Sequence, residues 1–278
     1  MKDRAQGAMA ALAVILAASG AYAGTTSQNV ATDTGAPDLF QPPPNLFQLT
    51  YGGRSAPGSN NSSTATNTFN IRYDHAVDLP SAWTLTTRFD LPLQAKYTTS
   101  PDGLSGQTGA GIGDSDAQAA LIDSLNERWA FGFGMRLIAP TGNEGLSSGK
   151  WRVMPIVGAR YALPEVSSSS YFEPLLRYDA SVAGDPTKRN IRNLQFAPML
   201  NIGLPSGWSL TLYPDADIRF NFGDPAPGQT GRWFVPIDVR VTKLLTKGVA
   251  ISCEVGVPII NDYPVYNFKT QLRLAVFY

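Results

Sequence analysis

Histidine and cysteine are almost missing from this sequence: His75 and Cys253 are the single examples of each among 278 residues. One cysteine cannot form a disulfide within the chain, so a disulfide-stabilised secreted scaffold is excluded. Because the sequence offers no cluster of cysteine and histidine ligands, it does not favour a transition-metal site. We therefore expect neither a metal nor a cofactor.

The chain also has no net charge. The chain has 22 basic and 22 acidic residues and a net charge of +0, so nothing in its charge attracts nucleic acid. The sequence has one apolar run near the amino terminus and no second one, so the sequence after it predicts no transmembrane helix. What the sequence has in quantity is 26 Gly and 21 Pro, which favour many turns over a helical bundle.

The first residues have the order of a secretory signal peptide. Lys2 and Arg4 precede the uncharged run AMAALAVILAAS, and the small residues AYA follow at 21–23. A retained membrane anchor is the alternative, but the run is too short to cross a bilayer as a helix. The sequence thus predicts that residues 1–23 are a cleaved signal peptide and that the mature chain begins at Gly24.

Apolar and polar residues alternate along most of the mature chain, as they do along a β-strand with one apolar face. A clear case is residues 69–78, where Phe69, Ile71, Tyr73 and Val77 share one face. The same reading predicts twelve strands, at 45–51, 69–78, 83–94, 115–125, 129–138, 151–163, 171–183, 193–204, 208–222, 232–244, 249–257 and 266–278.

Strand length and loop length favour a membrane barrel over a soluble β-sandwich, which alternates too. Several predicted strands exceed ten residues, a length typical of strands that cross a bilayer at a tilt. Long polar loops are expected at 52–67, 98–113, 141–150 and 223–231, and they alternate with tight turns such as LPSA, NER, LPSG and LTKG. Long loops on one rim and short turns on the other are typical of outer-membrane barrels.

The tryptophans give the strongest indication, because all five lie at strand ends. An indole has an apolar body and one N–H group, so it favours the headgroup level of a bilayer. Two aromatic bands are therefore expected at the two membrane interfaces, formed by Trp83, Trp129, Trp151, Trp208, Trp233 and the last residue, Tyr278. We conclude that the sequence predicts an all-β, antiparallel, transmembrane outer-membrane β-barrel over residues 45–278.

Charged residues gather on the face opposite the apolar one, at a similar depth from the tight turns. Such side chains cannot face lipid, so they are expected to line the lumen. Two roles that do not exclude each other are expected: the charges pair to hold neighbouring strands in register, and they form the constriction that a solute passes. The predicted lumen residues are Arg72, Asp74, Arg88, Asp90, Arg136, Arg177, Asp215, Asp238, Arg240, Glu254 and Arg273.

The segment that precedes the first strand has no alternating pattern. Residues 24–44 are rich in Thr, Ala, Gly and Pro and end in QPPPN. We expect an irregular arm, which lies in the periplasm or folds into the lumen as a plug.

Prolines inside five predicted strands remove ladder hydrogen bonds, so bulges or kinks are expected at Pro155, Pro174, Pro198, Pro214 and Pro236.

Enzyme motifs are weak. GLSSG at 145–149 fits the spelling of a hydrolase nucleophile elbow around Ser147, but it lies in a predicted loop without the flanking strand and helix. The glycines of GAGIGD at 109–114 lack the spacing of a dinucleotide-binding loop. We therefore expect no enzyme and no catalytic residue.

The stretch GAGIGDSDAQAALIDSLNERWAFGFGMRLIAPTG at 109–142 resembles the outer-membrane channel family named after the meta pathway of phenol degradation. The carboxy-terminal aromatic strand resembles the assembly signal of Gram-negative outer-membrane proteins. These resemblances imply passive uptake of small molecules, with aromatic or hydrophobic compounds favoured. The expected partners are outer-membrane lipids, the barrel assembly machinery and a small-molecule solute. A structural barrel without transport, an outer-membrane enzyme and a soluble secreted β protein remain alternatives.

Overall fold

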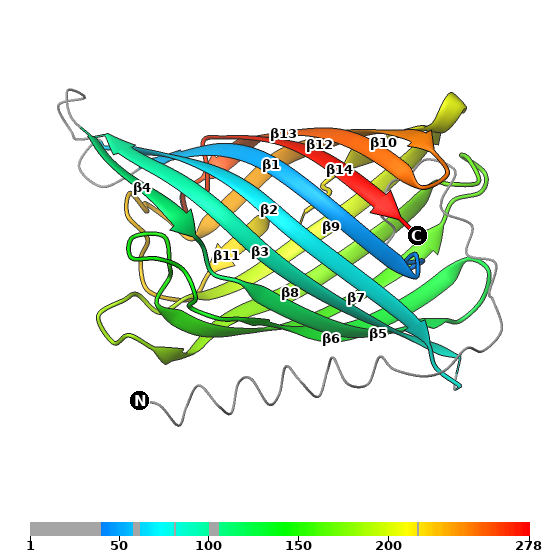
Figure 1. The fold of residues 1–278 in the computed structure, drawn as a ribbon, viewed down its shortest axis with the longest axis horizontal. Helices are drawn as coiled ribbons and strands as arrows, with labels where there is room; N and C mark the ends of the chain where they lie inside the picture. The colour runs from blue at the N-terminus through cyan, green and yellow to red at the C-terminus, as the bar shows by residue number, and fades with distance from the viewer. Residues whose placement is uncertain (1–39, 58–61, 81, 100–105, 216) are drawn as a thin grey trace.

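The computed structural model describes residues 40–278, except 58–61, 81, 100–105 and 216. The predicted signal peptide and residues 24–39 of the predicted arm lie outside the described residues. The described part of the chain is almost entirely antiparallel β-structure wrapped into a barrel (Figure 1). Its strands are β1 (Asn45–Pro57), β2 (Ser63–Asp78), β3 (Trp83–Thr99), β4 (Gly106–Ile112), β5 (Asp116–Ser124), β6 (Trp129–Ile138), β7 (Lys150–Ala162), β8 (Tyr171–Gly184), β9 (Arg192–Leu204), β10 (Trp208–Leu212), β11 (Ile218–Asn221), β12 (Trp233–Thr246), β13 (Val249–Asn261) and β14 (Phe268–Phe277).

Twelve strand positions surround the barrel, because two of them are filled by broken strands. β4 and β5 both pair with β3, β4 along its second half and β5 along its first. β10 and β11 both lie between β9 and β12. The predicted number of strands and the barrel fold are therefore confirmed.

The barrel closes between its first and last strands. β1 pairs with β14 from Leu46 opposite Phe277 to Ser55 opposite Phe268, and Figure 1 shows the two strands, blue and red, side by side. Asn45 reinforces the closure: its Nδ2 donates to the Tyr278 carbonyl at 3.1 Å, and the Tyr278 N–H donates to the Asn45 carbonyl at 3.1 Å.

Two of the four predicted long loops are wrong. Residues 52–57 and 63–67 belong to β1 and β2, and residues 98–99 and 106–112 belong to β3 and β4. Pairs of hydroxyl side chains cross between β2 and β3 here, such as Thr64 with Thr98 at 3.2 Å. Both faces of these strand ends are polar, so they carry no alternation by which the sequence could reveal them. The loops at 141–149 and 223–231 contain no strand, as predicted.

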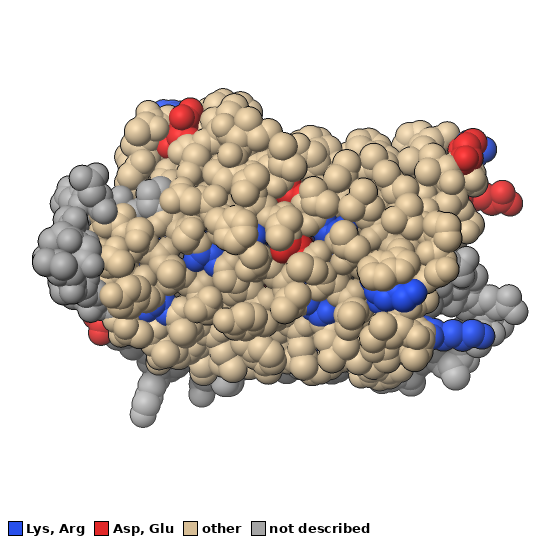
Figure 2. Space-filling view, turned by 90° about the horizontal axis from the view of Figure 1, so that it is seen from above, with Lys and Arg blue, Asp and Glu red and all other residues tan. Residues whose placement is uncertain are grey.

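The outer face of the barrel is apolar and the inner face is mixed. Along β6, the side chains of Trp129, Phe131, Phe133, Met135 and Leu137 are exposed, and the residues between them are buried or half-buried. Charged side chains are sparse on the face shown in Figure 2, where uncharged residues cover most of the surface. An apolar outer band of this kind suits a hydrocarbon environment. No helix in the described part of the chain is long and apolar enough to cross a membrane.

The in-strand prolines are accommodated in three ways. A register shift precedes Pro236, which lies opposite Pro258 on β13, so the predicted bulge is confirmed there. Pro214 lies in the break between β10 and β11. Pro174 and Pro198 face each other across β8 and β9, and the pairing of β7 with β8 skips the residues around Pro155 and Pro174. The pairing shows no register shift at Pro155, Pro174 or Pro198, so the expected bulges are not found there. The ladder of hydrogen bonds is interrupted instead, and neither strand needs an extra residue.

Candidate functional site

A polar cavity of about 420 Å³ lies inside the barrel. Its lining residues come from both halves of the chain, from Leu46 on β1 to Arg273 on β14. Ten cationic side chains line it, namely Arg54, Arg72, Arg88, Arg136, Arg152, Arg177, Arg219, Arg240, Lys269 and Arg273. Five acidic side chains do so, namely Asp114, Asp116, Asp179, Asp215 and Asp217. Cations therefore dominate the cavity surface.

All eleven predicted lumen residues belong to this charged interior. Seven line the cavity: Arg72, Arg88, Arg136, Arg177, Asp215, Arg240 and Arg273. The other four are acidic and pair with lining cations: Asp74, Asp90, Asp238 and Glu254. The structure thus brings the predicted residues together, with guanidinium groups toward the cavity and many carboxylates behind them.

On β2 and β3, the charges form two side-by-side pairs of opposite sign. Arg72 lies directly opposite Asp90, and Asp74 directly opposite Arg88. The Arg72 Nε donates to Asp90 Oδ1 at 2.8 Å. The next pair along the wall joins Arg136 Nε to Asp116 Oδ1 at 3.4 Å.

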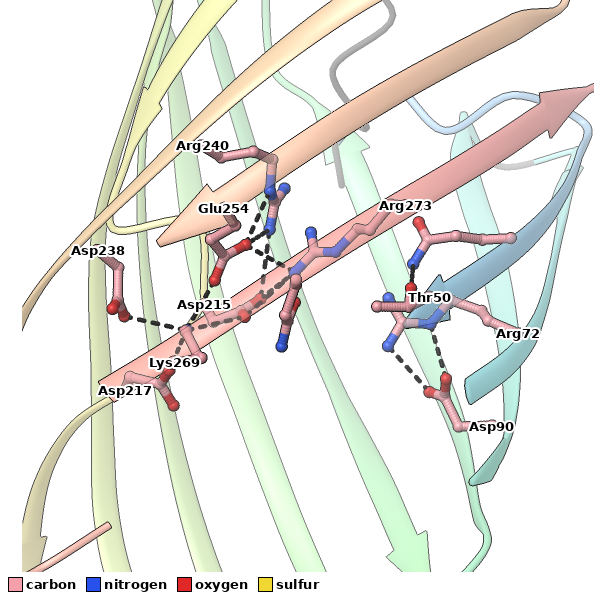
Figure 3. A network of polar contacts seen from close by, with 12 residues as sticks. Thr50, Arg72, Asp90, Asp215, Asp217, Asp238, Arg240, Glu254, Lys269 and Arg273 are labelled. Atoms are coloured by element: carbon pink, nitrogen blue, oxygen red, sulfur yellow. Dashed lines mark hydrogen bonds and ion pairs between the residues drawn. The ribbon is translucent and has the colours of Figure 1, made fainter. Parts of the chain in front are cut away.

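A second group of charges, the Lys269 cluster, lies across β12, β13, β14 and the break before β11 (Figure 3). Lys269 Nζ is 2.6 Å from Asp217 Oδ2, 2.7 Å from Glu254 Oε1, 3.2 Å from Asp238 Oδ2 and 3.5 Å from Asp215 Oδ2. The guanidinium groups that share these carboxylates belong to Arg219, Arg240 and Arg273. Four cations thus meet four carboxylates, so the cluster neutralises itself.

Several of these residues were missed by sequence reasoning. Lys269 shares its face with Arg273, and Asp116 shares its face with the Arg136 partner Gln118, so alternation could have found both. Asp217 lies in the strand break, where no alternation exists to place it. The Arg152 to Asp179 pair, with Nη1 2.6 Å from Oδ2, joins β7 to β8 near Pro155, where the ladder is interrupted.

Part of the inner wall is apolar. This inner apolar stripe is formed by buried side chains of β6, β7, β8 and β9: Ile138, Met154, Ile156, Leu175 and Ala197. Ile138 and Met154 line the polar cavity, whereas Ile156 and Leu175 line a second, smaller cavity of about 70 Å³. The stripe therefore connects the two cavities.

Phe40, the first described residue, lies inside the barrel. Its side chain is buried against Ile122 and Ala130, and it lines the smaller cavity. Gly132 and Gly158 face each other across β6 and β7. A Cβ at Gly132 would lie 3.0 Å from Phe40 Cε1, and one at Gly158 would lie 3.1 Å from Phe40 Cζ. The two glycines thus make a recess for the ring, because a larger side chain at either site would occupy its space.

The predicted aromatic residues lie at the ends of strands. Trp83, Trp129 and Trp208 are the first residues of β3, β6 and β10, next to short turns. Trp151 is the second residue of β7 and Trp233 the first of β12, both after longer connections. The side chains of Trp129, Trp208 and Trp233 are between 44% and 48% exposed on the outside. Tyr278 follows the last residue of β14 and is exposed.

The residues of the hydrolase-like motif hold a loop together. Asp114 Oδ1 accepts a hydrogen bond from the Ser147 hydroxyl at 2.6 Å, and Asp114 Oδ2 accepts from the Ser148 hydroxyl at 2.6 Å. His75 instead lies on β2 with its Nδ1 2.9 Å from Asn45 Oδ1, at the opposite end of the barrel from the loop. Ser147 and His75 therefore do not form a catalytic pair.

Comparison with solved structures shows the same fold. The crystal structure of an outer membrane channel from Pseudomonas putida F1 matches with a TM-score of 0.67 and 19% sequence identity, over 84% of this chain and 95% of that one. The transport unit of the autotransporter AIDA-I from Escherichia coli has a TM-score of 0.49 at 11% identity, over 91% and 99% of the two chains. The NanC porin has a TM-score of 0.48 at 14% identity, over 84% and 98%. At these identities the likeness concerns the fold.

Part of the sequence matches a family model. No curated protein matches the sequence. A family model described as "Putative MetA-pathway of phenol degradation" matches residues 47–171, a range that contains the whole motif at 109–142. The resemblance seen in that motif is therefore confirmed over this range.

Proposed function

We propose that this protein is an outer-membrane channel for the passive uptake of small molecules. The observation that carries the proposal is a polar cavity of about 420 Å³ inside a closed barrel whose outer face is apolar. A barrel built only as a scaffold could fill its interior with packed side chains, as small barrels do. The P. putida relative, which shares the fold, is described as an outer membrane channel.

Aromatic or hydrophobic compounds are the proposed solutes. The inner apolar stripe offers Ile156 and Leu175 to an apolar molecule, and the recess at Gly132 and Gly158 already holds the aromatic ring of Phe40. A pathway that is lined by both apolar and polar groups suits solutes with a ring and a polar substituent. The phenol-degradation description of the family agrees with this preference.

The same proposal assigns the surroundings of the barrel. Outer-membrane lipids would contact the apolar outer face, with the six strand-end aromatics at the two interfaces. The signal peptide would direct export of the chain. The barrel assembly machinery of a Gram-negative outer membrane would then recognise the last strand, β14.

A structural barrel without transport is the second candidate. The Lys269 cluster favours it, because its eight charged side chains form a self-neutralising network inside the barrel that joins the neighbouring strands β11, β12, β13 and β14.

Conductance across a planar lipid bilayer separates the two candidates. The mature chain from Gly24 is refolded, inserted and measured in potassium chloride, and the same sample is tested for swelling of liposomes in an aromatic alcohol and in a sugar of similar mass. Discrete current steps, with faster entry of the aromatic alcohol, support the channel. Inserted protein with no current and no swelling would leave the structural barrel.

A further inference from the structure

Of the five arginines of β2 to β8 that line the larger cavity, Arg177 on β8 is the one without an ion-pair partner among the described residues. Along the wall from β2 to β8, four arginines pair with four aspartates: Arg72 with Asp90, Arg88 with Asp74, Arg136 with Asp116 and Arg152 with Asp179. Among the described residues no carboxylate lies within ion-pair distance of Arg177, and its buried Nε has no hydrogen-bond partner. A buried polar group in this state costs free energy unless something else satisfies it.

Arg177 lies between the larger, polar cavity and the smaller cavity that the inner apolar stripe lines. It lines both the larger cavity and the smaller one that contains Phe40. Its neighbours on the inner face are Leu175, two residues earlier on β8, and Ile156, directly opposite on β7. The guanidinium group therefore lies beside the inner apolar stripe, between the charged cavity and the aromatic recess.

We propose that Arg177 binds the carboxylate of a small organic anion whose apolar body lies on the inner apolar stripe. A guanidinium group matches a carboxylate with two parallel N–H donors, and it keeps its charge when buried. An isoleucine and a leucine beside it favour an aromatic or aliphatic body over an inorganic anion. This inference rests on the proposed channel function and narrows its solutes to those with one carboxylate and one apolar part.

The excess of cationic side chains around the larger cavity also favours the binding of an anion. Its lining has ten cationic side chains against five acidic ones, because Asp74, Asp90, Asp238 and Glu254 lie behind their partners. Clefts that present one sign of charge raise the local concentration of the opposite sign. The paired guanidinium groups would thus attract the anion, and Arg177 would hold it.

Binding to the folded barrel in a nonionic detergent tests the assignment without any need for transport. Titration calorimetry would compare benzoate with benzyl alcohol, which keeps the ring and lacks the charge. We expect benzoate to bind at least about tenfold more tightly, since hydrogen bonds between charged groups are the stronger kind. Arg177→Gln should remove that difference, and Arg177→Lys should restore part of it, because lysine keeps the charge without the planar pair of donors.

Arg54→Gln is the matched control. Arg54 lines the larger cavity and also has no ion-pair partner among the described residues, but it does not line the smaller one. If the control loses benzoate binding as strongly as Arg177→Gln does, general attraction explains the binding and the assignment is wrong. Equal binding of benzoate and benzyl alcohol by the unchanged protein would also overturn it.

The outcome is separable from that of the channel proposal. Benzoate binding without current would refute the channel and leave the Arg177 site standing. Current without preferential benzoate binding would refute the site alone. Gel mobility of unboiled samples reports whether each variant is folded before it is titrated.

Discussion

Arg88 on β3 forms two parallel hydrogen bonds to the carboxylate of Asp74 on β2: Nε donates to Oδ1 at 2.8 Å, and Nη2 donates to Oδ2 at 2.6 Å. The two residues are directly opposite each other in the antiparallel pair. Slipping one strand by two residues would keep the apolar face outside but would bring like charges together. The ion pairs therefore select the register among those that the apolar pattern allows.

Reversing one charge of this pair should impair assembly, and reversing both should restore much of it. In Arg88→Asp, two carboxylates would face each other within the shielded lumen, a change that we expect to cost about 3 to 5 kcal/mol by analogy with broken buried pairs. Arg88→Asp combined with Asp74→Arg rebuilds an opposite-charge pair. The measurement is the folded fraction after refolding into detergent, read from the mobility of unboiled samples.

Arg128→Asp provides the matched control for that experiment. Arg128 pairs with Glu165 between two turns, where both side chains are largely exposed, so its reversal should change the folded fraction little. An equal loss in the control, or no recovery in the double variant, would show that the Arg88 to Asp74 pair does not set the register.

The sequence was sufficient for the parts of the strands that have an apolar outer face. Each of the twelve strand positions has an outer face of apolar residues, and alternation reports that face directly. Alternation ends where β1 and β2 extend beyond the apolar band with Thr64, Ser63 and their neighbours, which is why two loops were predicted too long. The register of β2 and β3 was predictable because four charges fit only one alignment.

The interior was less predictable, because residues that face the lumen can be either polar or apolar. Alternation places Ile156 and Leu175 on the inner face but does not show that they form a stripe beside Arg177. Phe40 belongs to a segment without any pattern, and its recess depends on Gly132 and Gly158 meeting across two strands. Asp217 joins the Lys269 cluster from a strand break. These placements come from tertiary packing, which local sequence does not encode.

The five tryptophans should report two separate depths in a bilayer. Variants that keep one tryptophan, with the other four replaced by phenylalanine, can be measured with lipids that carry bromine at known depths. We expect Trp83, Trp129 and Trp208 to lie near one interface and Trp151 and Trp233 near the other, about 25 Å away. Addition of a water-soluble quencher to one side only distinguishes the two interfaces. A tryptophan quenched best by bromine at the bilayer centre would contradict the two-band arrangement.

Asp114 should control the loop at 139–149. Its carboxylate accepts hydrogen bonds from the hydroxyls of Ser147 and Ser148 and from the Ser148 N–H at 2.8 Å. Asp114→Ala removes these acceptors, and we expect a loss of about 1 to 3 kcal/mol in local stability because the donors are partly buried. Hydrogen exchange should become faster at the Ser148 amide while the β2 and β3 amides stay protected. Asp78→Ala, at the turn between β2 and β3, removes the acceptor of the Thr84 hydroxyl and is the control that should leave the Ser148 amide unchanged.

Removing the ring of Phe40 should widen the path through the barrel. The ring fills space beside Gly132 and Gly158 and lines the smaller cavity, so Phe40→Ala should raise the single-channel conductance. Deleting residues 25–41 should raise it at least as much if the predicted arm is a plug. Phe131→Ala removes a ring of the same size from the outer face of β6, where the side chain is 38% exposed, and should leave the conductance unchanged. If the deletion and Phe40→Ala both conduct like the unchanged chain, the ring does not limit the current and the predicted arm is not a plug.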